Sequence, residues 1–126
     1  MILCLSAFFI ANVFAQKVAR VTISAKASIT EVLDNCKEAG KKKGYGSKDY
    51  DVANGKVTLW KTVGVIDPFD FIAQGSATFK DGTTTFVIRI PNNKKAIANY
   101  KKELKIIVKH LKLPEMMVGE YTNDIE

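Results

Sequence analysis

Cys36 and His110 are the residues of this chain best suited to nucleophilic or metal chemistry. A nucleophilic cysteine needs a base beside it, and His110 falls on a different predicted helix. Cys36 shares a helical stripe with Val32 and Leu33, which favours a buried and inert thiol. A single histidine without a second histidine or a cysteine at ligand spacing does not make a metal site. We therefore predict no metal ion and no cofactor.

Paired carboxylates are the next candidates for chemistry. Asp67 and Asp70 flank a Pro-Phe pair, and Asp49 and Asp51 alternate along a predicted strand. Acid–base catalysis needs one carboxyl group in an apolar pocket that raises its pKa. These positions are instead turns or the polar side of a sheet, and turn chemistry accounts for Asp67 before Pro68. No base, nucleophile and oxyanion donors can be assembled, so we predict that the protein is not an enzyme.

The element that must position any site is a hairpin over residues 70–91, with Asp81-Gly82 as its turn. This dipeptide favours a two-residue type I′ turn, which pairs Lys80 with Thr83 and fixes the register. One face then carries Ala73, Gly75, Ala77, Phe79, Thr84, Phe86, Ile88 and Ile90, and the other carries Gln74, Ser76, Thr78, Lys80, Thr83, Thr85, Val87 and Arg89. The pattern predicts an antiparallel sheet that is covered on one side.

Further elements flank this hairpin. Alternation predicts a strand over 17–24, and the capping box from Ser28 to Glu31 predicts a helix that ends near the 40–44 segment. After a loop over 45–48, a strand beginning at Tyr50 and an Asn54-Gly55 turn lead into a strand over 56–65. A two-residue turn there would pair Tyr50 with Leu59 and Val52 with Val57. A long helix then runs from Asn92 or Asn93 to about Leu113, where Pro114 stops it.

These elements predict an α+β fold, a two-layer sandwich. Its antiparallel sheet has about five strands, both helices lie on one face, and the order is β-α-β-β-β-β-α. Residues 16–113 form a single domain. Residues 114–126 form an acidic tail, which we expect to be loosely held. A helix-grip fold is the alternative, because its long C-terminal helix would match.

Over residues 17–112, this element order resembles half of a TATA-binding-protein-type (TBP-like) fold. It is also similar to small exported bacterial domains of unknown function that have this fold. The resemblance implies the same two-layer architecture. DNA binding does not carry over, because Phe71, Phe79 and Phe86 all fall on the covered side and leave no phenylalanine wedges on the open face.

The N-terminus predicts export. Residues 2–15 are apolar and uncharged, and they end in Val13-Phe14-Ala15, with small residues at the positions that a signal peptidase reads. This run is too short to span a bilayer comfortably. We expect cleavage after Ala15 and a secreted or periplasmic protein. The alternatives are an N-terminal core strand and a membrane anchor.

The open face of the sheet is the predicted contact surface. Tryptophan and arginine are favoured at the centres of contact surfaces, and here both types stand among hydroxyl and amide side chains. The predicted binding residues are Thr58, Trp60, Thr62, Gln74, Thr78, Thr85 and Arg89. The alternative is an ordinary solvated face on which threonine supports strand formation.

A second candidate surface is a lysine stripe on the long helix. The chain carries a net charge of +6, and the anion-attracting residues would be Lys101, Lys105, Lys109 and Lys112. Such a stripe could attract an anionic membrane surface, lipopolysaccharide or nucleic acid. Export argues against nucleic acid, and no aromatic residues lie between the lysines. The alternative is the ordinary solvated side of a helix.

The sequence therefore predicts an exported, non-enzymatic binding domain. We expect a monomer whose partner is a protein or a small ligand. The alternative is a carrier of a small apolar ligand. Its cavity would lie between the long helix and the sheet, lined by Tyr100, Leu104, Phe86 and Ile88. The small residues Ala73, Gly75 and Ala77 would leave room for it, or would instead admit the helices at close range.

Overall fold

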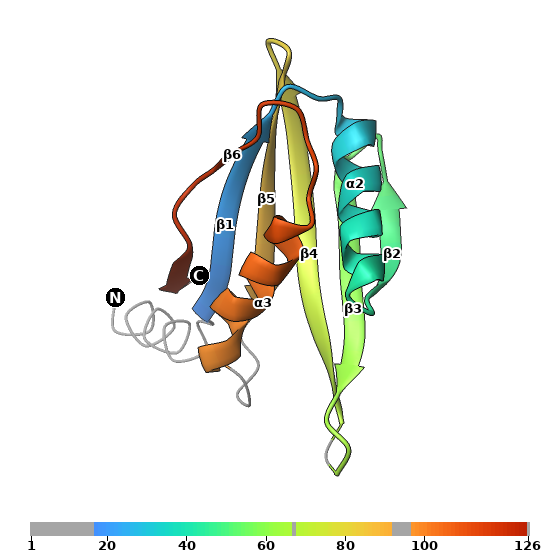
Figure 1. Ribbon diagram of the computed structural model, residues 1–126, viewed down its shortest axis with the longest axis vertical. Coiled ribbons are helices and arrows are strands. Elements are labelled where there is room, and N and C mark those ends of the chain that lie inside the picture. The colour runs from blue at the N-terminus through green and yellow to red at the C-terminus, as the bar shows by residue number, and fades with distance from the viewer. Residues whose placement is uncertain (1–16, 67, 92–96, 126) are drawn as a thin grey trace, which may run out of the picture.

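The computed structural model describes residues 17–66, 68–91 and 97–125, which form one antiparallel sheet with two helices on one face (Figure 1). The elements are β1 (Lys17–Ala25), α2 (Ile29–Lys42), β2 (Gly46–Asp51), β3 (Lys56–Val63), β4 (Phe69–Lys80), β5 (Thr83–Pro91), α3 (Ile97–Lys109), β6 (Met117–Val118) and β7 (Thr122–Ile125). The predicted α+β two-layer sandwich is confirmed. The predicted signal segment, the Asp67 turn and the predicted helix start at Asn92 or Asn93 lie outside the described residues.

The hairpin of β4 and β5 has the predicted register. Lys80 pairs with Thr83, and the pairing continues without a shift to Gln74 and Arg89. Asp81 and Gly82 both have positive φ, 53° and 76°, as a type I′ turn requires. The sheet order is β2-β3-β4-β5-β1-β6, and β7 also pairs with β1. The hairpin therefore occupies the middle of the sheet.

The core lies between the sheet and the helices. Ser28 caps α2 as predicted, because its Oγ accepts a hydrogen bond from the Glu31 amide at 3.1 Å. The side chains that the sheet and the two helices direct toward each other are buried, including Val21, Ile23, Val32, Leu33, Leu59, Phe86, Ile88, Tyr100, Leu104 and Ile107. A Cβ placed on Gly75 would lie 2.6 Å from Cζ of Phe86. The Phe86 ring therefore fills the room that Gly75 leaves.

The predicted register of β2 and β3 is wrong. Asp51 pairs with Lys56 across a four-residue turn over 52–55, and the register shifts between Lys48 and Asp51. The Asp51 carboxylate accepts hydrogen bonds from the Asn54 amide at 3.2 Å and from Asn54 Nδ2 at 2.7 Å, which stabilises the longer turn. Asp49 has a positive φ of 53° within the shifted segment.

This register changes which side chains enter the core. The predicted loop over 45–48 is instead the point where β2 begins, at Gly46. Tyr50 and Val52 are exposed, rather than facing Leu59 and Val57 on the covered side. Tyr45 is buried in their place.

Phe79 is a further correction. Its predicted position was the covered face, but 53% of the residue is exposed. Its partner Thr84 is buried, and Thr84 Oγ1 donates a hydrogen bond to the Ala27 carbonyl at 2.5 Å. The segment between β1 and α2 therefore covers Thr84 but does not shield Phe79, beside the turn of the hairpin.

The C-terminal region also differs from the prediction. Helix α3 ends at Lys109 rather than near Leu113, and the amides of His110 and Leu111 bond to carbonyls three residues earlier. The tail is not loosely held along its length. Strand β6 pairs with Ile23 and Ser24, and β7 pairs with residues 17–20. The sheet therefore has seven strands rather than about five, and β1 lies inside it.

Candidate functional site on the open sheet face

The predicted contact residues lie on the sheet face opposite the helices. Strands β3, β4 and β5 present them at alternate positions, because successive side chains of a strand point to opposite faces. Trp60, Thr62, Gln74, Thr78 and Thr85 are exposed, and Thr58 and Arg89 are half-buried. Three of these residues, Thr58, Gln74 and Arg89, line a groove, and the other four are not part of its lining.

The strand registers align polar side chains in one row across the sheet. Lys48 pairs with Thr58, Thr58 with Gln74, and Gln74 with Arg89. Arg89 in turn pairs with Arg20 on β1. We call Lys48, Thr58, Gln74, Arg89 and Arg20 the transverse row. Neighbouring strands lie about 4.8 Å apart, so the four intervals of the row span about 19 Å.

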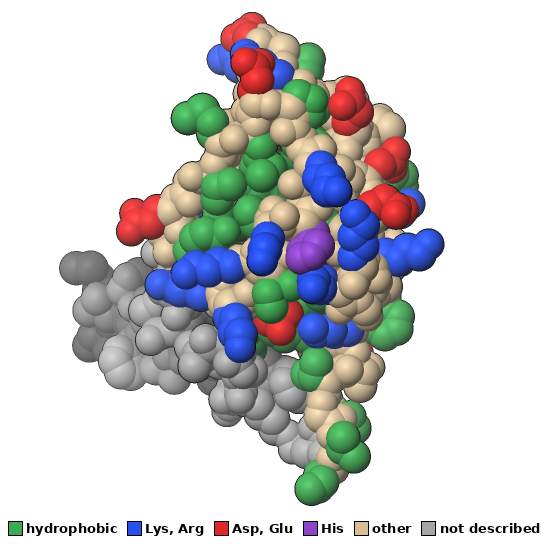
Figure 2. Space-filling model, viewed as in Figure 1, with side chains coloured by type: hydrophobic (Ala, Val, Ile, Leu, Met, Phe, Trp, Pro, Cys, Tyr) green, Lys and Arg blue, Asp and Glu red, His purple; other side chains and the backbone are tan. Residues whose placement is uncertain are grey.

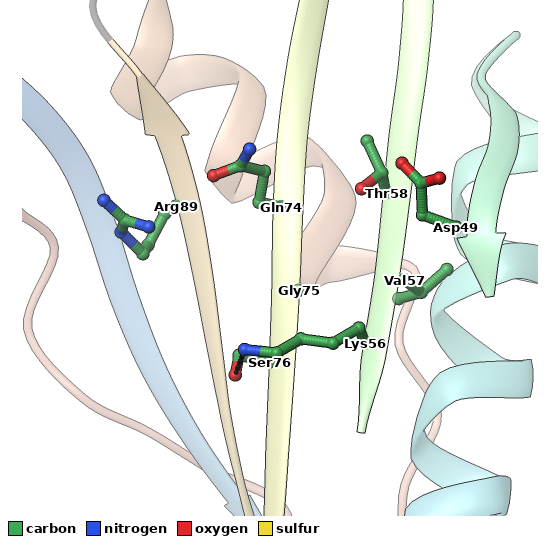
Figure 3. A pocket seen from close by; sticks show the side chains of 8 residues that line it. All are labelled: Asp49, Lys56, Val57, Thr58, Gln74, Gly75, Ser76 and Arg89. Carbon is green, nitrogen blue, oxygen red and sulfur yellow. Dashed lines mark hydrogen bonds between the residues drawn. The ribbon is translucent and has the colours of Figure 1, made fainter. Parts of the chain in front are cut away.

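A groove of about 310 Å³ is lined in part by Thr58, Gln74 and Arg89, the three central members of this row (Figure 3). It is lined by Asp49, Lys56, Val57, Thr58, Gln74, Gly75, Ser76 and Arg89. Lys56 lies across β4, and its Nζ donates a hydrogen bond to Ser76 Oγ at 2.8 Å. In Figure 3, Asp49 and Arg89 lie at opposite sides of the groove, with Gln74 and Thr58 between them. The groove thus offers hydroxyl, amide and charged groups side by side.

The centre of this face is basic. Arg20 and Arg89 are the only arginines of the chain, and they stand directly opposite each other on neighbouring strands. Like charges in that position repel. Lys48 and Lys56 add two more cations, and Asp49 is the acidic residue among the described residues that line the groove. Arg20, Arg89, Lys48 and Lys56 thus give the centre of this face a positive charge.

Trp60 lies beside the row, two residues from Thr58 on β3. It pairs with Gly46 of the neighbouring strand β2. A Cβ on Gly46 would lie 2.9 Å from Nε1 and 3.0 Å from Cε2 of Trp60. The indole ring therefore lies across Gly46, where a larger residue would displace it. The residue remains 38% exposed, which leaves aromatic surface available for contact.

Sequence reasoning missed Arg20 and Lys48 as members of the site. Alternation along 17–24 does place Arg20 on the polar side of its strand. The pairing of β1 with β5, which brings Arg20 beside Arg89, joins segments that are far apart in the chain. Lys48 was missed because its segment was predicted as a loop. The residue types on this face could therefore be predicted from the sequence, but the order and pairing of the strands could not.

The predicted anion-attracting lysines lie on the other layer of the molecule. Lys101, Lys105 and Lys109 are exposed at four-residue intervals along α3, so they share one side of it. Lys112 is exposed too, but it lies beyond the helix end, where its amide donates to Asn35 Oδ1 at 2.7 Å. Figure 2 shows many basic side chains on this face. The protein therefore has two separate basic regions, one on each face.

The predicted roles of Cys36 and the turn carboxylates can be compared with their surroundings. Cys36 is buried, and desolvation raises the pKa of its thiol to about 12. Hydrogen bonds from Asn54 lower the pKa of Asp51. Asp70 Oδ1 accepts a hydrogen bond from Thr62 Oγ1 at 3.0 Å. Nδ1 of His110 lies 2.9 Å from the Ile106 carbonyl oxygen of its own helix. Cys36 and His110 thus lie apart from the groove.

A polar cluster on the helix side was not predicted. The Tyr45 hydroxyl donates to Glu103 Oε2 at 2.5 Å, and Lys61 Nζ lies 3.2 Å from the same oxygen. Lys61 Nζ also lies 4.4 Å from the centroid of the Tyr45 ring. Burial raises the pKa of Tyr45, and the hydrogen bond to Glu103 raises it further. Lys61 on the inward side of β3 was the sequence signal for this cluster, which joins β3 to α3.

Within 17–66, 68–91 and 97–125, no group of three or more His, Cys, Asp or Glu side chains is placed to hold a metal ion. Over the same ranges, no helix has the length and apolar character needed to cross a membrane. Comparison of the chain with protein-family models and with curated proteins gave no match.

Proposed function

We propose that this protein is an exported, non-enzymatic binding domain whose contact surface is the open sheet face. The observation that carries the proposal is the transverse row of cationic, hydroxyl and amide side chains beside the exposed Trp60. Three residues of the row, Thr58, Gln74 and Arg89, line a groove. Proteins place tryptophan and arginine at the centres of contact surfaces, where they supply much of the binding energy.

The packing of the interior favours the surface over an internal carrier site. The side chains that would line the carrier cavity, Tyr100, Leu104, Phe86 and Ile88, are each at most 2% exposed. The Phe86 ring occupies the space beside Gly75. An apolar ligand would therefore have to displace packed side chains, and such displacement costs stability.

The chemistry of the groove favours binding over catalysis. Its described lining offers ammonium, guanidinium, amide and hydroxyl groups and the Asp49 carboxylate, which suit charge pairing and hydrogen bonding. Cys36 is a buried residue of α2, and its thiol lies in the core, where it cannot reach a substrate in the groove. Export, in turn, is supported by the apolar segment over 2–15 and the small residues at its end.

A capture experiment with Trp60→Ala tests this proposal. The wild-type protein is immobilised and exposed to envelope and culture fractions of its host, and the bound material is quantified. We expect Trp60→Ala to lower recovery of a bound component at least tenfold, because the central aromatic contact is lost.

Phe79→Ala is the matched control, since it removes an exposed aromatic ring beside the turn of the β4–β5 hairpin. It should recover as much material as the wild type. Circular dichroism of both variants verifies that the fold is retained. Full recovery by a folded Trp60→Ala variant would remove the open face as the contact surface.

A further inference from the structure

We infer that the open-face groove binds an acidic polysaccharide, a chain of sugar rings that carries carboxylate or sulfate groups. This inference rests on the proposed function and names the ligand of the same site. Three features of the site carry it: the placement of its cations, the length of the row, and the aromatic surface beside the row.

The cations are placed to hold acidic groups. Arg20 and Arg89 stand opposite each other in the row, and Lys48 marks its other end. Lys56 lines the groove beside them. Guanidinium groups bind carboxylate and sulfate-like oxygens through two parallel hydrogen bonds, whereas ammonium groups act as point charges. The site therefore combines two geometrically selective cations with two adaptable ones.

The length of the row suits a chain rather than a single small anion. Cations stand at both ends of a span of about 19 Å, given the usual strand spacing, and uncharged Thr58 and Gln74 lie between them. A repeating acidic chain can reach Lys48 and Arg20 at the same time. The hydroxyl and amide groups of Thr58, Gln74 and Ser76 then face the sugar hydroxyls between the acidic groups.

Trp60 supplies the apolar part of the site. Its indole ring lies across Gly46 and remains partly exposed, so the ring is held in place from one side. A flat aromatic surface packs against the C–H faces of sugar rings, and cations close by hold the acidic substituents. The aromatic surface beside the cations favours a sugar chain as the ligand, because a simple anion would need only the cations.

The same features do not favour single-stranded nucleic acid. Proteins that bind such strands stack successive bases on several aromatic side chains along the groove. Here Trp60 lies beside the row, whereas Phe71 and Phe86 are buried on the helix side of the sheet. The hydroxyl-rich and amide-rich groove also suits sugar hydroxyls better than base faces.

Calorimetric titration tests the inference. The mature protein is titrated with oligogalacturonate as the carboxylate probe, dextran sulfate oligomers as the sulfate probe, and neutral dextran, each at low and high salt. We expect binding to at least one acidic glycan, weakening of that binding with salt, and no binding to neutral dextran. The two acidic probes decide between carboxylate and sulfate.

Variants locate the binding. Arg89→Gln and Trp60→Ala should each lower the affinity at least tenfold. Lys56→Gln, at an exposed residue, provides a second charge variant in case Arg89→Gln perturbs the fold. Lys102→Gln is the matched control, because it removes one exposed charge from α3. It should leave the affinity within twofold of the wild-type value.

Three results would overturn the inference: no binding to either acidic glycan, equal losses in Lys102→Gln and Lys56→Gln, or tighter binding of a single-stranded DNA oligomer that depends on Trp60. The second result would mean diffuse charge attraction, and the third would mean a nucleic-acid ligand. If the glycans fail while Trp60→Ala still loses its captured component, the inference falls and the proposed function stands.

Discussion

Individual residues of the open face act through their neighbours on adjacent strands. Trp60 keeps its position because Gly46 has no side chain, and Arg89 acquires its basic surroundings because Arg20 stands opposite it. Neither relation joins residues that are close in the sequence. The residue types on this face could be predicted, but the pairs that give them their properties depend on the strand order.

Cys36 shows the opposite case, in which local sequence predicted the environment. Its position on the apolar stripe of α2 indicated burial, and the residue is 1% exposed. Burial raises the pKa of the thiol to about 12, because the anionic form cannot be hydrated in the core. The thiol should therefore not react with thiol reagents at pH 8 while the protein is folded.

The raised pKa also predicts a pH dependence of stability. In the unfolded chain a cysteine ionises near pH 8.5. The folded-state pKa of Cys36 is higher, so the folded protein keeps the thiol proton at a pH where the unfolded chain loses it. The contribution of the neutral thiol to the free energy of unfolding is therefore fully present below the unfolded-state pKa, and it is lost as the pH rises toward the folded-state pKa. Between pH 8 and 10.5, the wild type should lose about 2.5 kcal/mol more unfolding free energy than Cys36→Ala. Urea titrations at both pH values measure this difference, and parallel losses in the two proteins would contradict it.

Among the elements, two turns show how far a dipeptide signal can be used. Asp81-Gly82 forms the predicted tight turn, with both residues at positive φ. At Asn54-Gly55, by contrast, the Asp51 carboxylate binds Asn54, and the turn is longer. Its Gly55 carbonyl also accepts a hydrogen bond from the Ala77 amide at 2.7 Å. A side chain and a third strand thus outweighed the dipeptide preference.

This difference predicts unequal effects of alanine at the two glycines. Both glycines have positive φ, where alanine costs about 1–2 kcal/mol. A Cβ at Gly82 would have no heavy atom within 4 Å, but a Cβ at Gly55 would overlap the Ala77 carbonyl oxygen, at 2.1 Å. Gly55→Ala should therefore destabilise the protein by about 2 kcal/mol more than Gly82→Ala, because the backbone must shift. Equal losses in urea denaturation would show that β4 does not constrain the first turn.

The fold could be predicted at the level of layers and helix faces for a physical reason. Residue alternation in β4 and β5 and the stripes of α2 and α3 are local patterns, and each is set by burial on one side. The positions of β6 and β7 could not be predicted in this way. Residues 114–126 carry several acids and short apolar stretches, and their pairing with β1 depends on the sheet edge that the rest of the chain provides.

At the scale of the whole molecule, the two faces of the sheet differ in what covers them and in which side chains they present. One face packs against α2 and α3, whose outer surface carries exposed lysines. The other face presents the transverse row, the groove and Trp60. The basic character of the chain is thus divided between a helical surface with lysines alone and a sheet surface with both arginines.

The most direct test of the open face as the contact surface is a nuclear magnetic resonance titration of the ¹⁵N-labelled protein with the component that it captures. The chain has one tryptophan, so its indole N–H signal reports on Trp60 without ambiguity. We predict that this signal and the backbone amides of Thr58, Gln74 and Arg89 shift together on binding. Shifts confined to the exposed side of α3, with an unchanged indole signal, would contradict the proposed site.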